Sequence, residues 1–177
     1  ALERQGALPT KTQALPIDEN YIEVNGIAVS RFATSHDCEG SSGYTFLLPD
    51  GKRFTLCTDL GIVTDAVREA ILKSDCILIE SNHDIEMLKR GPYPPLLKMR
   101  ILSDKGHISN NACAAELAEL LKSGTTRFIL GHLSQNNNTP ILARSCAESA
   151  LMAVGAQNGK DYLLSVAAPK GNGVTVI

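Results

Sequence analysis

The four histidines of the chain share a position relative to the predicted secondary structure, since each stands just beyond a strand or just before a helix. They are His36, His83, His107 and His132. Loops at strand ends are where α/β proteins gather reactive side chains. One histidine in such a place is usually a solvated or a core residue, but four placed alike favour a common site. The sequence therefore indicates chemistry based on imidazole groups that the fold brings together.

Carboxylate and amide side chains accompany these histidines. Imidazole and carboxylate ligands together favour zinc, manganese or iron. An aspartate can bridge two metal ions held about 3.5–4 Å apart, an arrangement that serves phosphoryl transfer, and Asp59 is the best candidate for that bridge. The accompanying residues are Asp37, Asp59, Glu80, Asn82, Ser134, Asn136, Asn137 and Asn138.

The polar residues after His132 lie where a helix is predicted to begin. Backbone N–H groups and short polar side chains at a helix N-terminus suit a phosphate oxygen. The same residues would also serve as ordinary helix caps, so both roles stay open. We predict that Ser134 and Asn136 contact substrate phosphate, together with Asn82 and His83 beyond another strand.

The elements that must position these residues are predicted to be strands first and then strands alternating with helices. Turn signals such as Asn25-Gly26 and Pro49-Asp50-Gly51 separate the early strands. This order fits a mixed sheet layered with helices, in one domain over residues 1–177. The predicted strands are 22–24, 27–33, 43–48, 53–58, 76–80, 127–130, 162–166 and 174–177. The predicted helices are 64–73, 109–122 and 140–154, with a helical region over 85–102 that glycine and proline interrupt.

Length and composition agree with a single globular domain. A chain of 177 residues is long enough for a real core. Its hydrophobic fraction of 44% and charged fraction of 20% are ordinary for a folded protein. No apolar run approaches the roughly 18 residues of a membrane span, so we expect no membrane partner. The five cysteines form no CxxC pair, which predicts reduced thiols in a cytoplasmic protein and argues against a structural zinc site.

A net charge of −2 gives no general attraction to nucleic acid, so any recognition of phosphate must be local. One stretch, residues 89–105, is locally basic, with Asp104 as its single acidic residue. Such a run most often forms a solvated helix face, and the alternative is a surface that faces a substrate. Its basic residues are Lys89, Arg90, Lys98, Arg100 and Lys105.

Five short segments resemble, in order and spacing, the C-terminal motifs of the metallo-β-lactamase superfamily, and the match is closest to the YycJ/WalJ-like branch. By matching position, the resemblance implies metal-binding roles for His36, Asp59 and His132. Asp59 would bridge two divalent ions, zinc or manganese, with iron as a further option. The segments are TSHD at 34–37, CTDLG at 57–61, IESNHD at 79–84, KGHISN at 105–110 and GHLSQNNNTP at 131–140.

The resemblance implies an α/β (α+β) fold, the αββα sandwich of this superfamily. The opening HxHxDH motif of the family, which supplies further ligands, has no counterpart in the sequence. The chain starts at Ala1 and is predicted to be only the C-terminal part of the sandwich. We therefore expect this fragment to bind metal weakly, to be inactive alone, and to present an apolar sheet surface that favours homo-oligomers.

Two further residues are similar to a pair in the tRNA 3′-end-processing endonucleases of the superfamily. In those enzymes a glutamate holds a histidine that is implicated in proton transfer. By matching position, Glu80 and His107 form this pair and join Asp59 as candidate catalytic residues. A carboxylate that fixes one tautomer of an imidazole and raises its basicity makes a proton donor near neutral pH. The alternative is a structural pair that pins two loops together.

The function that the resemblance implies is metal-dependent hydrolysis, by a phosphodiesterase or exonuclease that acts on nucleic acid. DNA is favoured over RNA because YycJ/WalJ-like proteins are associated with 5′-to-3′ exonuclease activity on DNA. Two alternatives stay open. One is a small-molecule hydrolase of the lactonase or glyoxalase kind, which would not need the basic stretch. The other is a non-catalytic binding module that has lost its metal site.

Overall fold

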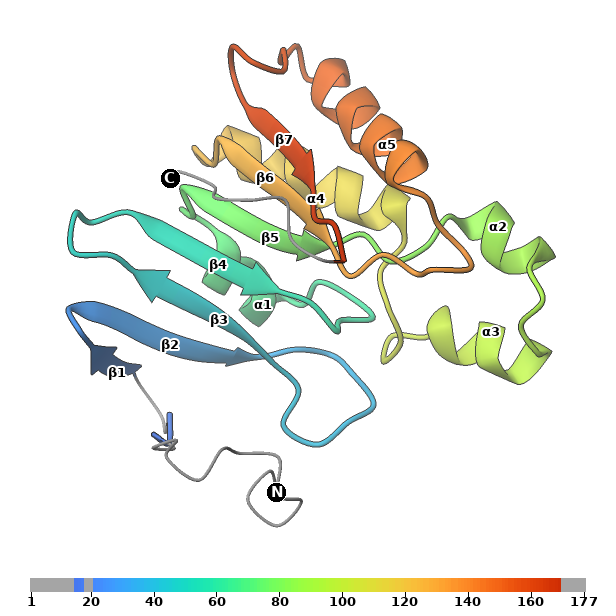
Figure 1. Ribbon diagram of the computed structural model, residues 1–177, viewed down its shortest axis with the longest axis horizontal. Coiled ribbons are helices and arrows are strands. Elements are labelled where there is room, and N and C mark those ends of the chain that lie inside the picture. The colour runs from blue at the N-terminus through green and yellow to red at the C-terminus, as the bar shows by residue number, and fades with distance from the viewer. Residues whose placement is uncertain (1–14, 18–20, 170–177) are drawn as a thin grey trace.

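One mixed sheet of seven strands, layered with helices, makes up the computed structural model, which describes residues 15–17 and 21–169 (Figure 1). The strands are β1 (Tyr21–Val24), β2 (Ile27–Ala33), β3 (Ser42–Leu47), β4 (Arg53–Cys57), β5 (Cys76–Glu80), β6 (Arg127–Gly131) and β7 (Leu163–Val166). The helices are α1 (Asp65–Ile71), α2 (Ile85–Arg90), α3 (Pro95–Ile101), α4 (Asn110–Lys122) and α5 (Pro140–Ala153).

Strand order in the sheet follows the order along the chain. β1 to β4 are antiparallel neighbours, and β4 to β7 are parallel. Short turns join β1 to β2 and β3 to β4, whereas the loop of residues 34–41 joins β2 to β3. The turn between β1 and β2 uses Asn25 and Gly26 at φ 51° and 78°, the left-handed pair that a tight hairpin requires. The parallel strands are joined by crossovers that contain the helices, as parallel pairing demands. Helices therefore have to lie against the sheet.

The core lies between the sheet and three of these helices. Side chains alternate across a strand, so Ile77 and Ile79 of β5 point to the same face. Both are fully buried against a cluster to which α1, α4 and α5 contribute. Figure 1 shows α1 and α4 behind the sheet, with α5 beside α4 near β7. The helix residues of this cluster include Val67, Ile71, Leu117, Leu120, Ala147 and Leu151.

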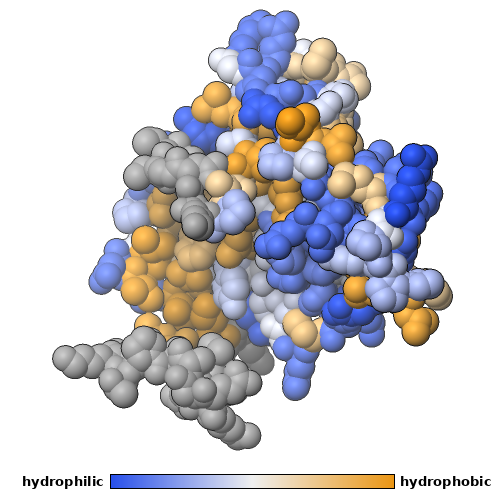
Figure 2. Space-filling view, turned by 45° about the vertical axis from the view of Figure 1, so that its right-hand side comes forward, coloured by the Kyte–Doolittle hydropathy of each residue, from blue (hydrophilic) through white to orange (hydrophobic). Residues whose placement is uncertain are grey.

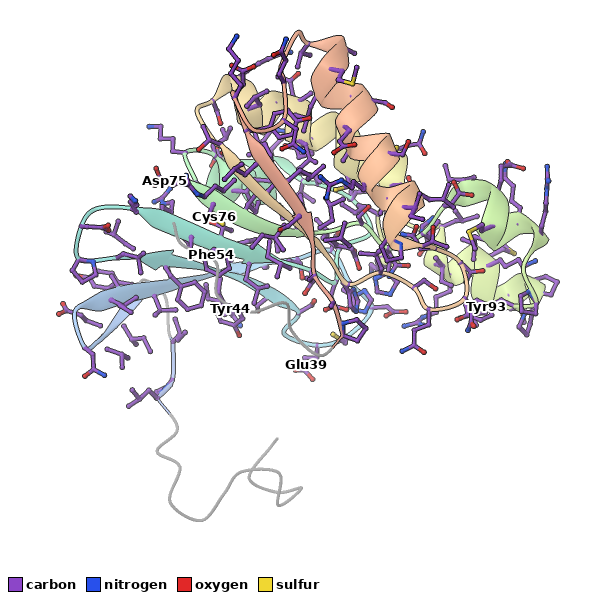
Figure 3. The ribbon with its side chains drawn as sticks, turned by 45° about the horizontal axis from the view of Figure 1, so that its top comes forward. Glu39, Tyr44, Phe54, Asp75, Cys76 and Tyr93 are labelled. Atoms are coloured by element: carbon purple, nitrogen blue, oxygen red, sulfur yellow. The ribbon has the colours of Figure 1, made fainter. Side chains whose placement is uncertain are left out.

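The opposite face of the sheet is apolar, and Figure 1 shows no helix over it in the described part of the chain. Strand pairing places Phe46 opposite Phe54, with their rings 5.7 Å apart, and Leu56 opposite Leu78. Figure 3 labels Tyr44 and Phe54 on this face, and Figure 2 shows an apolar area over the strands. Of the four layers of an αββα sandwich, the described residues therefore form one sheet and its helical layer.

Most predicted elements are present with small changes of boundary. The strands predicted at 27–33 and 76–80 agree with β2 and β5. The interrupted helical region is two short helices, because prolines at 92, 94 and 95 prevent one continuous helix. The strand predicted at 174–177 lies outside the described residues. Among the helices that the structure describes, none combines the length and apolar character that a membrane crossing needs.

Candidate metal centre

The candidate site lies where the ends of several strands meet. β2 runs in the same direction as β4, since both are antiparallel to β3, and β4, β5 and β6 are parallel. The carboxyl ends of these four strands therefore share one edge of the sheet. His36, Asp59 and His132 follow β2, β4 and β6, and Glu80 ends β5. Figure 1 shows α2 and α3 beyond the same edge.

The side chains of His36, Asp59 and His132 converge, as the sequence predicts. Nε2 of His36 lies 3.7 Å from Oδ1 of Asp59, and Nε2 of His132 lies 3.8 Å from the same oxygen. The ring of His107 stands between the two other imidazoles, 4.8 Å from the ring of His36 and 5.2 Å from that of His132. Three imidazoles and a carboxylate therefore surround one small volume.

Hydrogen bonds fix the orientation of the two outer imidazoles. Nδ1 of His36 donates to the carbonyl of Gly106 at 3.0 Å, because a carbonyl oxygen can only accept. Nδ1 of His132 donates to the carboxylate of Glu80 at 2.5 Å. In the neutral form of both rings Nε2 then keeps its lone pair, and it faces Asp59. An imidazole whose other nitrogen is held in this way is the usual ligand of a divalent ion, so the donor set fits a metal.

Two of the three predicted metal ligands occupy a strained backbone conformation. Asp59 has φ 57° and His132 has φ 53°, the left-handed region that residues other than glycine rarely adopt. Such residues cost about 1–3 kcal/mol each and persist where the surroundings hold them. Clustering of this strain at functional sites is common, so the backbone supports the same location as the side chains.

Glu80 connects two of the imidazoles and is fully buried. Its Oε1 accepts from Nδ1 of His107 at 2.8 Å and from Nδ1 of His132, while Oε2 accepts from the backbone N–H groups of Leu60 and Ile108. Burial is the largest single influence and raises the pKa of Glu80, but the hydrogen bonds of His107 and His132 bring that pKa below its ordinary value. The hydrogen bond to Glu80 raises the pKa of His132.

The bond between Glu80 and His107 is predicted from the sequence, and the bond between Glu80 and His132 is new. The pairing of β5 with β6 explains it, because Glu80 lies opposite Gly131, one residue before His132. The sequence alone does not contain this register. His107 also belongs to both groups of side chains that could hold a metal ion, one with His36 and Asp59 and the other with Glu80 and His132.

Gly106 allows the loop before His107 to approach the end of α3. A Cβ at this position would lie 2.2 Å from the carbonyl oxygen of Ile101, so the backbone would have to move. We expect Gly106→Ala to lower the free energy of unfolding by about 3 kcal/mol, the upper end for overpacking against atoms that cannot yield. Moving the loop would also shift the carbonyl that holds His36. Urea unfolding measures the loss.

Gly51→Ala is a comparison in which the added methyl group meets no neighbour. Gly51 has φ +84°, and a Cβ there meets nothing within 4 Å. Gly51→Ala should lower the free energy of unfolding by about 1–2 kcal/mol, the cost of placing an alanine in the left-handed backbone conformation. Gly106 has no positive φ, so any loss there reports the close approach to Ile101, and a loss in Gly106→Ala smaller than that in Gly51→Ala would contradict the expected clash.

A cavity of about 340 Å³ adjoins the candidate metal centre. His107 and His132 line it together with residues of α3 and of the loop after β6, and with Asn82 and Tyr93. Three of the four residues predicted to contact substrate line this cavity, namely Asn82, Ser134 and Asn136. Asn82 also donates to the carbonyl of His132 at 2.9 Å, which helps to hold that strained residue.

His83 is absent from the lining of this cavity. Its side chain is 1% exposed, and within the described residues neither ring nitrogen has a hydrogen-bond partner. Burial lowers the pKa of His83, which keeps the imidazole neutral. The segment after β5 turns this ring into the protein, and the contact between His83 and substrate stays a prediction.

The basic stretch divides into two parts. Lys89 and Arg90 pair with Glu86 on the exposed surface of α2, as expected of a solvated helix face. Arg100 instead reaches the site and makes a bidentate ion pair with Asp37, in which Nη2 lies 2.7 Å from Oδ1. The hydrogen bond from Arg100 lowers the pKa of Asp37. One of the five basic residues thus lies beside the candidate centre and lines the cavity.

No protein-family model matches the chain. It is 34% identical over 163 residues to exodeoxyribonuclease YycJ of Bacillus anthracis, covering 88% of this chain and 61% of that protein. It is 39% identical over 136 residues to exodeoxyribonuclease WalJ of Streptococcus pneumoniae serotype 2, covering 77% of this chain and 50% of that protein. The chain therefore spans about half to three fifths of these relatives.

Solved structures share the fold. The metallo-β-lactamase fold protein YhfI of Bacillus subtilis superposes with a TM-score of 0.59 at 14% identity, covering 94% of this chain and 57% of that one. Zn(2+)-bound PqqB of Methylobacterium extorquens superposes with a TM-score of 0.52 at 19% identity, covering 78% of this chain and 47% of that one. At these identities the likeness concerns the fold alone.

Proposed function

Because this chain belongs to the YycJ/WalJ-like branch of the metallo-β-lactamase fold, we propose that the complete protein is a metal-dependent hydrolase of phosphodiester bonds in DNA. It acts as an exonuclease through a dinuclear metal centre, in the cytoplasm. The names of the two relatives, both exodeoxyribonucleases, support DNA over RNA as the substrate.

One observation carries this proposal, the convergence of His36, Asp59 and His132 with Nε2 of both imidazoles facing the same carboxylate oxygen. Ordinary surface ion pairs do not place two imidazoles in this way with their other nitrogens already engaged. The donors suit zinc, manganese or iron. His36, Asp59 and His132 would hold the divalent ions.

Divalent ions bound there would lower the pKa of a water molecule and neutralise charge on the phosphate oxygens. The residues of the chain provide the remaining functions. Asn82 and Ser134 line the adjacent cavity and can donate hydrogen bonds to a phosphate. His107 is the proton donor to the departing oxygen, since its Nδ1 is held by Glu80 and its ring lines the cavity. A fixed imidazole in such a position acts as a general acid.

We expect this 177-residue chain to bind zinc or manganese weakly. Ions of this kind normally take three or four protein ligands each, whereas His36, Asp59 and His132 would have to serve two. Isothermal titration calorimetry, with Asp59→Ala as the control, measures the affinity and the number of ions. A tight pair of ions on these residues alone would contradict the expectation.

The function is tested on the complete protein, loaded with manganese or zinc. A 5′-phosphorylated DNA strand, the matching RNA, a lactone and a thioester are offered in parallel. We expect the DNA to be shortened from its end and the lactone and thioester to be left intact. Faster turnover of the lactone or thioester would replace the proposal by a small-molecule hydrolase. A complete protein that neither binds metal nor hydrolyses any of these substrates would instead be a non-catalytic binding module.

A further inference from the structure

The cavity beside the metal centre has one aromatic wall, Tyr93. This residue lies in the segment between α2 and α3, within the sequence Gly-Pro-Tyr-Pro-Pro. Pro92 and Pro94 restrict the backbone on either side of it. Its hydroxyl accepts a hydrogen bond from Nδ2 of Asn136 at 3.0 Å, from the loop after β6. Figure 3 labels Tyr93 at the α2–α3 end of the molecule. The ring is therefore held in place before any ligand arrives.

The other walls divide into apolar and hydrogen-bonding surfaces. Leu97 and Leu133 contribute apolar surface. Arg100 and Ser134 contribute donors. Arg100 donates from Nε and Nη2 to Asp37. Among the described residues nothing is bonded to its Nη1, which can therefore donate to a ligand. An aromatic ring, apolar side chains and a guanidinium in one cavity suit a ligand with a flat base and a phosphate.

The size of the cavity restricts that ligand. Its volume of about 340 Å³ is near the lower end of small-ligand pockets, about 300–1,000 Å³. One nucleotide is a ligand of this size, and a base pair with its two backbones is much larger. His107 and His132 on the remaining side place the metal centre within one nucleotide of Tyr93.

We propose that this cavity binds the terminal, unpaired nucleotide of a DNA strand, with its base stacked on Tyr93 and a phosphate oxygen bound by Arg100. This inference rests on the proposed function and names the form of the substrate. Stacking on an aromatic ring tolerates every base, because each base has a flat face. The end of a duplex must then open by one nucleotide before the strand enters.

The first test measures binding to the 177-residue chain without metal, in the presence of a chelator. The probe is a fluorescent 5′-phosphorylated single-stranded oligonucleotide, read by anisotropy. We expect Tyr93→Ala to weaken binding about 5- to 150-fold, the loss that corresponds to one base stacked on an aromatic ring. Tyr93→Phe keeps the ring and loses only the bond with Asn136, so its affinity should stay within about fivefold of the parent.

An oligonucleotide whose terminal sugar carries no base separates stacking from general effects. The parent should bind it as weakly as Tyr93→Ala binds the normal oligonucleotide. Equal affinity of the parent for both oligonucleotides would overturn the proposal. So would equal affinity of the parent and Tyr93→Ala for the normal oligonucleotide.

A fluorescent reporter gives an independent readout, because the chain contains no tryptophan. The tryptophan fluorescence of the Tyr93→Trp variant should be quenched by the normal oligonucleotide, and much less by the oligonucleotide without the terminal base. Tyr21→Trp, an exposed position on β1, is the control and should respond to neither. Quenching of the control to the same extent would show non-specific binding and count against the cavity.

Cleavage by the complete protein distinguishes this inference from the proposed function. We expect Tyr93→Ala to raise KM on single-stranded DNA while kcat changes little, since the ring binds but does not react. If the parent cuts DNA and Tyr93→Ala cuts it equally well, the function stands and the cavity assignment fails. If the parent cuts no DNA but the reporter at position 93 is quenched, the cavity assignment stands and the exonuclease proposal fails.

Discussion

Substitution of His107 by alanine should slow cleavage of DNA by the complete protein about 100- to 10,000-fold. The reason is the loss of a proton donor for the oxygen that leaves the phosphorus. His107 is held through Nδ1 by the buried carboxylate of Glu80 at 2.8 Å, and its ring forms part of the cavity wall. The measurement is kcat/KM on a 5′-phosphorylated DNA strand, with the metal content of parent and variant determined in parallel.

His107 has a second possible role, as a metal ligand, which the experiment must distinguish from that of a proton donor. Its nitrogen lies within 4.8 Å of ligand atoms of His36 and Asp59, so it could serve as a metal ligand. A substrate with p-nitrophenolate as leaving group separates the roles, because that group departs with little protonation. A proton donor predicts a small loss on this substrate and unchanged metal content. An equally large loss, or loss of metal, would remove the acid role.

The fold could be predicted wherever local patterns decide it. α4 begins after Ser109, whose hydroxyl accepts from the backbone N–H of Ala112 at 3.2 Å, and this cap is visible in the sequence. The break between α2 and α3 follows from prolines in the chain. The direction of the strands places His36, Asp59 and His132 at one edge of the sheet. The resemblance to the metallo-β-lactamase superfamily implies these three residues as ligands, and the place of each after a predicted strand leads to the prediction that they converge.

The rest of the site depends on contacts that local patterns do not contain. The bond between Glu80 and His132 follows from the register of β5 and β6, which pairs residues 51 positions apart at Glu80 and Gly131. The burial of His83 depends on how the segment after β5 packs, and a histidine at a strand end looks the same in sequence whether it turns outward or inward. The reach of Arg100 to Asp37 depends on the placement of α3.

Substitution of Glu80 by glutamine should weaken metal binding about 10- to 100-fold, the usual loss when the partner that orients a metal-binding histidine is removed. From the sequence alone, Glu80→Gln is expected to disturb only His107 and therefore to lower only the rate of cleavage. The additional bond to His132 extends it to a predicted metal ligand. Glutamine has nearly the same volume as glutamate, so the buried position is kept and the change is one of charge and hydrogen bonding.

The physical reason is the tautomer of the two imidazoles. Oε2 of Glu80 accepts from the N–H groups of Leu60 and Ile108, so the glutamine oxygen should take that place and turn its NH₂ group toward His107 and His132. An NH₂ group cannot accept the protons on Nδ1. Both rings would then have to accept on Nδ1 and carry their proton on Nε2. In His132 this removes the lone pair that faces Asp59.

Glu116→Gln is the matched control for this prediction. Glu116 is also a buried carboxylate, 4% exposed, but it pairs with Arg68 at 2.8 Å, and neither residue belongs to the site. Both variants should lose stability in urea unfolding, by about 1–3 kcal/mol, because each leaves buried partners poorly satisfied. Only Glu80→Gln should weaken binding of zinc or manganese in calorimetry on the complete protein. Equal metal affinities of the parent and Glu80→Gln would show that Glu80 supports the fold and does not orient the ligands.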